Sequence, residues 1–310
     1  MLFSDKTLKG KQLNQSMALI MILHIIKLYM SVCISESSYD IKTERLYKTR
    51  QDLVQIPDGV FKLTDLKLLH LDENKIDKIP IKILSLNKLI DIDFSHNNIT
   101  YIPEEIYMMT TIEKLYLTRN SIKHVSKKIS ALVNLRVLDL SHNYIKHLPV
   151  DMSALTKLTH FDVSHNNLKV FPEEFCQMIM LEKLLINRNK ITAIPENISH
   201  LTKLKCLHCS SNKITHISYE LHKLKRLYDL TMHNNLIKEI TKRQLPNAQY
   251  ITLHHNPLEK LELHDHSNNL VELYEYFKSD EYILQQGKKV IAFLKIKALV
   301  AQYYEFTIYI

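Results

Sequence analysis

Asp139 and Asp162 are the residues of this 310-residue chain whose type and spacing best suit acid–base or metal chemistry. Each one begins the sequence D-x-S-H-N, so His142 and His165 follow them closely. On neighbouring strands the two carboxylates would lie about 5 Å apart, and carboxylates paired at that distance can act as acid and base. With His160 nearby as well, the hypotheses to weigh are a divalent metal site and a hydrolase site.

A recurring asparagine determines where these side chains lie. Apolar residues precede it by eight, five and three positions and follow it by two, as in LRVLDLSHNYI from Leu135 to Ile145. A fixed period in the twenties with the pattern L-x-x-L-x-L-x-x-N is the leucine-rich repeat signature. The asparagines recur every 23 residues, with a final step of 21, and are Asn74, Asn97, Asn120, Asn143, Asn166, Asn189, Asn212, Asn235 and Asn256.

Each repeat is expected to begin with a short strand, because alternate residues of its L-x-L segment face opposite ways. An inward asparagine can both donate and accept hydrogen bonds. Stacked repeats would therefore form a ladder of amides that satisfies buried backbone groups, which otherwise cost about 1–3 kcal/mol each. The sequence predicts an α/β fold, a leucine-rich repeat solenoid with a curved parallel β-sheet on the concave side and short helices or 3₁₀ turns on the convex side.

The convex half of each repeat carries apolar residues three apart after a proline, as in 101–106 and 193–198. This pattern predicts a short helix or 3₁₀ turn. Proline is missing at Ser126, Ser218 and Thr241, where we expect looser turns.

Charge and cysteine usage bear on the class of partner. The formal net charge is +8, carried by lysines dispersed along the sequence. A nucleic-acid binder should gather its charge in one stripe, so we interpret the charge as a solubility feature, with weak attraction to membrane surfaces, and expect no nucleic-acid partner. Cys206 and Cys209 form C-x-x-C, but three residues apart on a strand they face opposite ways, which argues against a shared redox or metal site.

The two ends of the chain depart from the repeat pattern. Residues 1–45 contain an apolar stretch at 17–34, which fits a signal sequence or anchor, a helix that caps the first repeat, or a leader that is not native. The repeats are expected at 46–258, starting with a degenerate copy in which Gln51 replaces the asparagine. Residues 259–310 are expected to form a helical cap at 270–279 and 285–304, followed by an apolar tail.

The repeats resemble the 23-residue intracellular leucine-rich repeats of Scribble, Erbin, the Ras-suppressor and SHOC-type scaffold proteins. Those proteins share the pattern L-x-x-L-x-L-x-x-N-x-L/I-x-x-L/I-P, and here it covers about residues 46–258. Their last repeat often ends N-P-L, as in Asn256-Pro257-Leu258. The resemblance implies non-catalytic protein binding and names no partner.

The outward strand positions should form one concave surface on which a partner protein binds. An open face lacks the pocket that a hydrolase or metal enzyme needs, and the Ser-His pairs lack an oxyanion donor and a third orienting group. We therefore expect no catalytic residues, no metal and no cofactor. The candidate partner-binding residues are Asp91, Asp93, Lys114, Tyr116, Arg119, Asp139, His142, His160, Asp162, His165, Lys183 and Arg188.

The function expected from these observations is that of a monomeric, cytoplasmic scaffold or adaptor in signalling. The alternatives are a membrane-tethered or secreted recognition ectodomain, which needs residues 17–34 to act in export, and a phosphatase-regulator-like repeat protein, which the 23-residue period disfavours. Because imidazoles beside carboxylates titrate near neutrality, partner affinity is expected to change between about pH 6 and 7.5.

Overall fold

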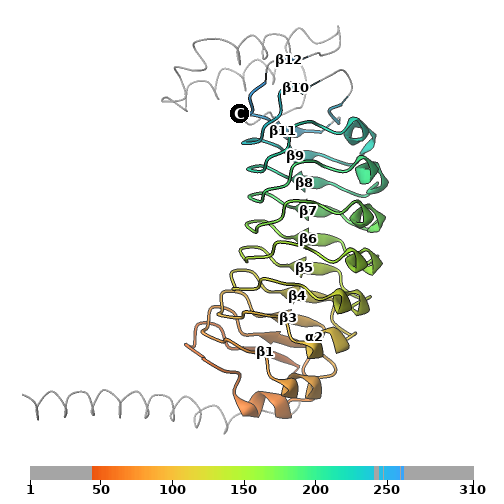
Figure 1. Cartoon of the computed structure of the whole chain (residues 1–310). Coiled ribbons are helices and arrows are strands. Elements are labelled where there is room, and N and C mark those ends of the chain that lie inside the picture. Colours follow the sequence, from red (N-terminus) through yellow and green to blue (C-terminus); the bar gives the residue numbers. More distant parts are fainter. Residues whose placement is uncertain (1–43, 241–243, 247, 259, 262–310) are drawn as a thin grey trace, which may run out of the picture.

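The computed structural model describes residues 44–240, 244–246, 248–258 and 260–261. Short parallel strands stack along the molecule, with one-turn helices on the opposite side (Figure 1). The predicted fold class, a leucine-rich repeat solenoid, is confirmed. The ten strands of the main sheet are β1 Arg45–Tyr47, β2 Leu68–His70, β3 Asp91–Asp93, β4 Lys114–Tyr116, β5 Val137–Asp139, β6 His160–Asp162, β7 Lys183–Leu185, β8 Cys206–His208, β9 Asp229–Thr231 and β11 Tyr250–Thr252.

The register of the sheet follows the sequence period. Strand β4 pairs with β5 so that Leu115 lies opposite Leu138, and each pair from β1 to β9 keeps this offset of one repeat. Strand β11 pairs with β9. A second, two-stranded parallel sheet joins β10 (Glu239–Ile240) to β12 (Lys260–Leu261). Strand β12 lies just past the expected end of the repeats at residue 258.

One-turn helices close each repeat on the convex side. Six of them begin directly after a proline, whose fixed φ suits the extended entry to the turn; two begin after Ser126 and Ser218. The helices are η1 Asp58–Lys62, η2 Ile81–Ser85, α2 Glu104–Met108, η3 Lys127–Ala131, η4 Val150–Ala154, η5 Glu173–Gln177, η6 Glu196–His200 and η7 Tyr219–Lys223.

The expectation of looser turns at Ser126 and Ser218 is wrong. Each serine hydroxyl caps its helix, accepting a hydrogen bond from the backbone N–H of Lys128 or Glu220. Helices η3 and η7 are as long as those that follow a proline. Serine therefore replaces the rigidity of proline with a capping hydrogen bond. Thr241 lies outside the described residues.

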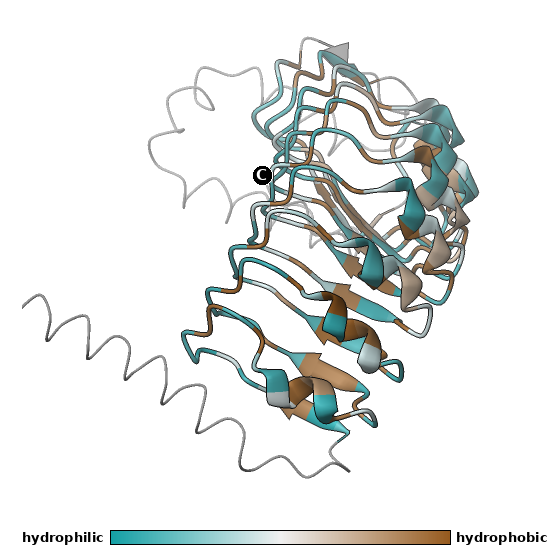
Figure 2. Ribbon diagram, turned by 60° about the horizontal axis from the view of Figure 1, so that its bottom comes forward, coloured by the Kyte–Doolittle hydropathy of each residue, from teal (hydrophilic) through white to brown (hydrophobic). Residues whose placement is uncertain are grey.

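The interior of the solenoid is apolar and continuous from repeat to repeat. Leu135, Leu138, Leu140 and Ile145 are completely buried, whereas Asp139 faces the concave side. Hydrophobic and polar segments alternate along each repeat in Figure 2. Each repeat thus buries its apolar side chains against two neighbours, as a solenoid requires.

A ladder of asparagine amides holds successive repeats together. The Oδ1 atom of Asn143 accepts from the backbone N–H of Ile122 in the preceding repeat, at 2.9 Å. Its Nδ2 donates to the carbonyl of Leu117 in that repeat, and to Leu140 and Ser141 in its own. One buried amide therefore satisfies backbone groups of two repeats, and the same pattern recurs from Asn97 to Asn235.

The residue before each asparagine has a left-handed backbone. Its φ lies between 52° and 55° in every repeat from Glu73 to His255, although none of these residues is glycine. A side chain with a Cβ atom adopts this conformation at a cost. The turn after each strand is therefore strained in the same way in each repeat.

The first and last turns differ from the central ones. Strand β1 has the register of the other strands, but the Gln51 side chain is exposed rather than buried in the ladder. Asn256 makes the ladder contacts to Ile237 and Met232, yet it is only partly buried. The apolar stretch 17–34, the expected helices at 270–279 and 285–304 and the tail 305–310 lie outside the described residues. Among the described helices, none is both long and apolar enough to cross a membrane.

Candidate partner-binding face

The twelve candidate residues lie in, or three residues beyond, five consecutive strands. Eight occupy the outward positions of β3 to β7, namely the first and last residues of those strands. Four follow their strand by three positions and have the left-handed backbone described above: Arg119, His142, His165 and Arg188. The fold therefore brings all twelve to the concave side of the sheet.

Asp139 and Asp162 are neighbours in the sheet, as their spacing indicates. Each carboxylate accepts a hydrogen bond from a backbone N–H two residues later, that of Ser141 or Ser164. Partial burial raises the pKa of both carboxyls, and the negative charge of Asp162 raises the pKa of Asp139 further. The pair is thus a stretch of crowded negative charge tied to the turns of its own strands.

Two histidines stack beside this pair. The rings of His142 and His165 lie 3.7 Å apart, centroid to centroid, and are almost parallel. Burial lowers the pKa of both, and the charge of Arg119 lowers the pKa of His142 more than Asp139 raises it. The change in charge of these two imidazoles therefore moves to more acidic pH, opposite to the direction that the neighbouring carboxylates alone would give.

His160 does not join the carboxylates. It lies opposite Val137, in the other outward row of the sheet. Its Nδ1 atom is 2.9 Å from the hydroxyl of Thr159. The predicted cluster of three histidines around two aspartates is therefore reduced to the stacked pair.

The N-terminal part of the concave face carries a small ion-pair network. The carboxylate of Asp91 lies 3.1 Å from both His70 Nε2 and Lys114 Nζ. Tyr116 lies between Asp93 and Asp139 in the register of the sheet. An aromatic ring set between acids, with the exposed Arg119 three residues further along the chain, is a typical anchor for a protein partner.

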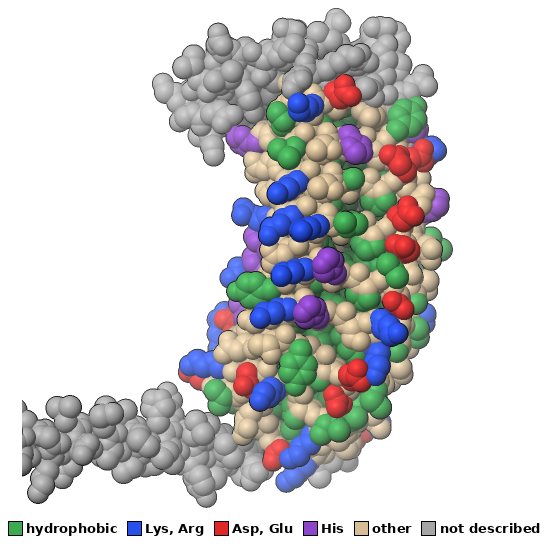
Figure 3. All heavy atoms as spheres, in the orientation of Figure 1, with side chains coloured by type: hydrophobic (Ala, Val, Ile, Leu, Met, Phe, Trp, Pro, Cys, Tyr) green, Lys and Arg blue, Asp and Glu red, His purple; other side chains and the backbone are tan. Residues whose placement is uncertain are grey.

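Charged residues also gather outside the concave face. Figure 3 shows Lys, Arg and His side chains in a row that crosses successive repeats. Three consecutive repeats have an exposed lysine at the third position after the asparagine, and two of them add an exposed histidine at the fourth, so these lysines are less dispersed than expected. We call this set the basic row: Lys123, His124, Lys146, His147 and Lys169.

Sequence reasoning missed one cluster, formed by Cys206, His208 and Asp229 at the C-terminal part of the concave face. Cys206 does not act with Cys209 of the C-x-x-C sequence. Cys209 points into the core, as its register predicts, and is fully buried. The signal that could have found the cluster is C-x-H on one strand with an aspartate one repeat later. Burial and the nearby charge of Asp229 raise the pKa of the Cys206 thiol to about 12.

Stacked parallel strands, a buried asparagine ladder and an open concave face define a leucine-rich repeat solenoid. Residues 116–275 match the family described as "Leucine-rich repeat region", and residues 65–122 match "Leucine rich repeat". The chain belongs to the leucine-rich repeat family. Domains of this family are typically non-catalytic modules that bind proteins.

Solved structures from distant organisms share the fold. A Leptospira interrogans leucine-rich repeat protein is 26% identical, with 75% of this chain and 70% of that one covered and a TM-score of 0.58. The plant peptide hormone receptor RGFR1, in complex with RGF2, is 26% identical over 67% of this chain and 37% of its own, with a TM-score of 0.59. An internalin, InlF of Listeria monocytogenes, is 18% identical over 77% and 90%, with a TM-score of 0.56.

These similarities do not all support the same conclusions. The internalin shows the fold alone, and this chain spans little more than a third of the plant receptor chain. Among curated proteins no match is found. The repeats are therefore assigned to their family, without assignment to the Scribble and Erbin group that they resemble.

Proposed function

We propose that this protein is a non-catalytic scaffold or adaptor that holds a partner protein on its concave face in intracellular signalling. The observation that carries the proposal is the combination of Tyr116, Arg119 and the Asp139–Asp162 pair on one open surface. Aromatic and arginine side chains contribute most to protein interfaces, and mixed charges steer a complementary partner.

Two further observations support a protein partner. The concave face is a row of outward side chains on rigid strands, which presents a broad surface rather than a site for a small molecule. The plant receptor RGFR1, which shares the fold, forms a complex with RGF2. Recognition on a repeat surface of this kind thus fits the chemistry of the candidate residues.

The proposal is tested by proximity labelling in cells, with the intact chain compared to a triple variant, Tyr116→Ala, Arg119→Ala and Asp139→Ala. All three side chains face outward, so the circular dichroism spectrum should stay close to that of the intact protein; melting should fall only slightly, because Asp139→Ala also removes the acceptor for the backbone N–H of Ser141. We expect the variant to lose a set of cytosolic signalling proteins that the intact chain labels.

A matched control changes the basic row instead, with Lys123→Ala, Lys146→Ala and Lys169→Ala. This control should keep the labelled set. If it loses the set while the concave triple variant retains it, the concave site is wrong and the partner binds at the edge that carries the basic row.

A recognition ectodomain is the second candidate function. It is favoured by the likeness to a plant hormone receptor and by the apolar stretch at 17–34. Asn98 and Asn197 begin N-x-S/T sequons. Labelling confined to proteins of the secretory pathway, together with glycan attachment at either of them, would replace the intracellular proposal with this one.

A further inference from the structure

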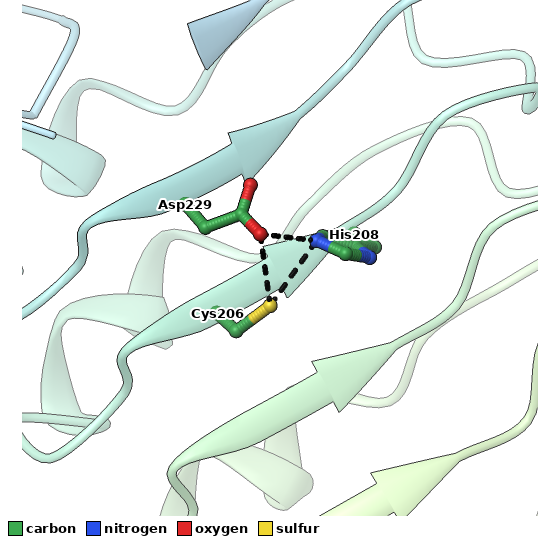
Figure 4. Close-up of side chains that lie close together, drawn as sticks. All are labelled: Cys206, His208 and Asp229. Atoms are coloured by element: carbon green, nitrogen blue, oxygen red, sulfur yellow. Dashed lines mark hydrogen bonds and ion pairs between the residues drawn. The ribbon is translucent and has the colours of Figure 1, made fainter. Parts of the chain in front are cut away.

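Cys206, His208 and Asp229 direct a sulfur, a nitrogen and an oxygen toward one point (Figure 4). Cys206 and His208 are two positions apart on β8, so both side chains face the concave side. Asp229 lies opposite Cys206 on β9. The pleat and register of the sheet therefore bring the three side chains together without a special loop.

The three ligand atoms are close enough to share one ion. The distances are 2.8 Å from His208 Nε2 to Asp229 Oδ2, 3.1 Å from Cys206 Sγ to His208 Nε2, and 3.5 Å from Cys206 Sγ to Asp229 Oδ2. Around tetrahedral zinc, ligand atoms of these types lie about 3.3–3.6 Å apart. Small side-chain rotations, of about half an ångström at the atoms, would open the cluster to that geometry.

We propose that Cys206, His208 and Asp229 form a binding site for a divalent transition-metal ion of the zinc class. Thiolate and imidazole ligands select zinc-like ions over magnesium and calcium, which prefer oxygen. As the bond from Sγ to the metal forms, the thiol proton leaves to solvent. Three protein ligands leave a fourth position for water or for a side chain of a bound partner.

The surroundings of the cluster suit an ion. Cys206 is almost completely buried, while His208 and Asp229 are partly exposed, so the sulfur forms the floor of the site and solvent reaches it from one side. A bound thiolate and carboxylate would carry two negative charges. Lys183 is the cationic neighbour, opposite Cys206 on β7; its side chain is exposed, so water screens its repulsion of the metal ion.

A second cluster on the concave face provides an internal comparison. His70, Asp72 and Asp93 also place ligand atoms near one another, but they offer no sulfur and none of them is buried. The proposal assigns the metal to the cysteine cluster and predicts that changes in the second cluster leave thiolate coordination unaffected.

The test is a titration of the full-length, chelator-treated protein with Co²⁺, which reports thiolate ligation through a charge-transfer absorption band, followed by competition with Zn²⁺. We expect one Co²⁺ per chain, a charge-transfer band, and displacement by Zn²⁺. Cys206→Ser should abolish the band. His208→Gln and Asp229→Asn should each weaken affinity by more than the about 10–100-fold typical of outer-shell changes.

Matched controls are Cys209→Ala, which changes the inward cysteine, and His70→Gln in the second cluster; both should retain the band. Circular dichroism without metal establishes that each variant is folded, and the two outward variants at His208 and Asp229 keep the test decisive if Cys206→Ser does not fold. Absence of the band in the intact protein, or its persistence in Cys206→Ser, would overturn the proposal. This inference does not depend on the proposed scaffold function.

Discussion

In the segment from Asp139 to Asn143, the first side chain faces the concave surface and the last faces the interior. The interior position is asparagine in nine successive repeats, whereas the position of Asp139 is occupied by His, Asp, Tyr, Leu or Thr elsewhere. The backbone around the amide makes the same demand in each repeat, because the same N–H and C=O groups need partners. The concave position has no such demand, so its side chains are free to serve recognition.

The largest effect should come from breaking the ladder. Asn143→Leu removes the acceptor for the buried N–H of Ile122, and we expect the free energy of unfolding to fall by about 3 kcal/mol. Leu135→Met keeps the volume of a fully buried side chain and should cost less than about 1.5 kcal/mol. Urea unfolding followed by circular dichroism measures both. Equal losses would mean that burial, rather than the hydrogen bonds of the amide, holds the repeats together.

A smaller effect of opposite sign is expected on the concave face. Asp139→Asn keeps the acceptor for the N–H of Ser141 and removes the repulsion from Asp162. At neutral pH it should stabilise the fold by about 0.2–1 kcal/mol, the range of cross-strand pair effects. Asp151→Asn, at an exposed position of η4, is the matched control and should have little effect.

The same variant should change the dependence of stability on pH. The folded-state pKa of Asp139 and Asp162 is raised. Their contribution to the free energy of unfolding is therefore fully present below the unfolded pKa and is lost as pH rises through the folded pKa. The lowered pKa of His142 and His165 acts in the opposite way, and stability is lost as pH falls through their folded pKa. Asp139→Asn should flatten the loss of stability that occurs as pH rises through the carboxyl pKa; an unchanged profile would remove this account.

The smallest effect concerns the strained residue before the asparagine. Ser211 has a φ of 54°, a conformation that asparagine tolerates better than most residues. Ser211→Asn should stabilise the protein by a few tenths of a kcal/mol, a fraction of the about 1–2 kcal/mol that left-handed backbone costs. Lys213→Asn, two positions later, lies outside the left-handed position and should bring no gain. A loss of stability at Ser211 would show that the turn holds its conformation without strain.

The sequence predicted the fold well because the period of 23 residues repeats one physical requirement many times. Register, inward leucines and the neighbouring positions of Asp139 and Asp162 all follow from it. The site was harder to predict because it depends on single side chains. Counting residues placed His160 near the aspartates, whereas its ring lies against the hydroxyl of Thr159. The Cys206 cluster needed two strands considered together, and the caps at Ser126 and Ser218 needed the local hydrogen bonds.

The ladder has a consequence for how the gene can change. Since each amide bonds its own turn and the one before it, with the same geometry along the chain, excision or duplication of one whole 23-residue unit would rejoin matching partners. Each added unit would lengthen the concave face by about 5 Å, the spacing of parallel strands. The span of a bound partner can thus be adjusted in discrete steps by unequal crossing-over, without any new packing solution.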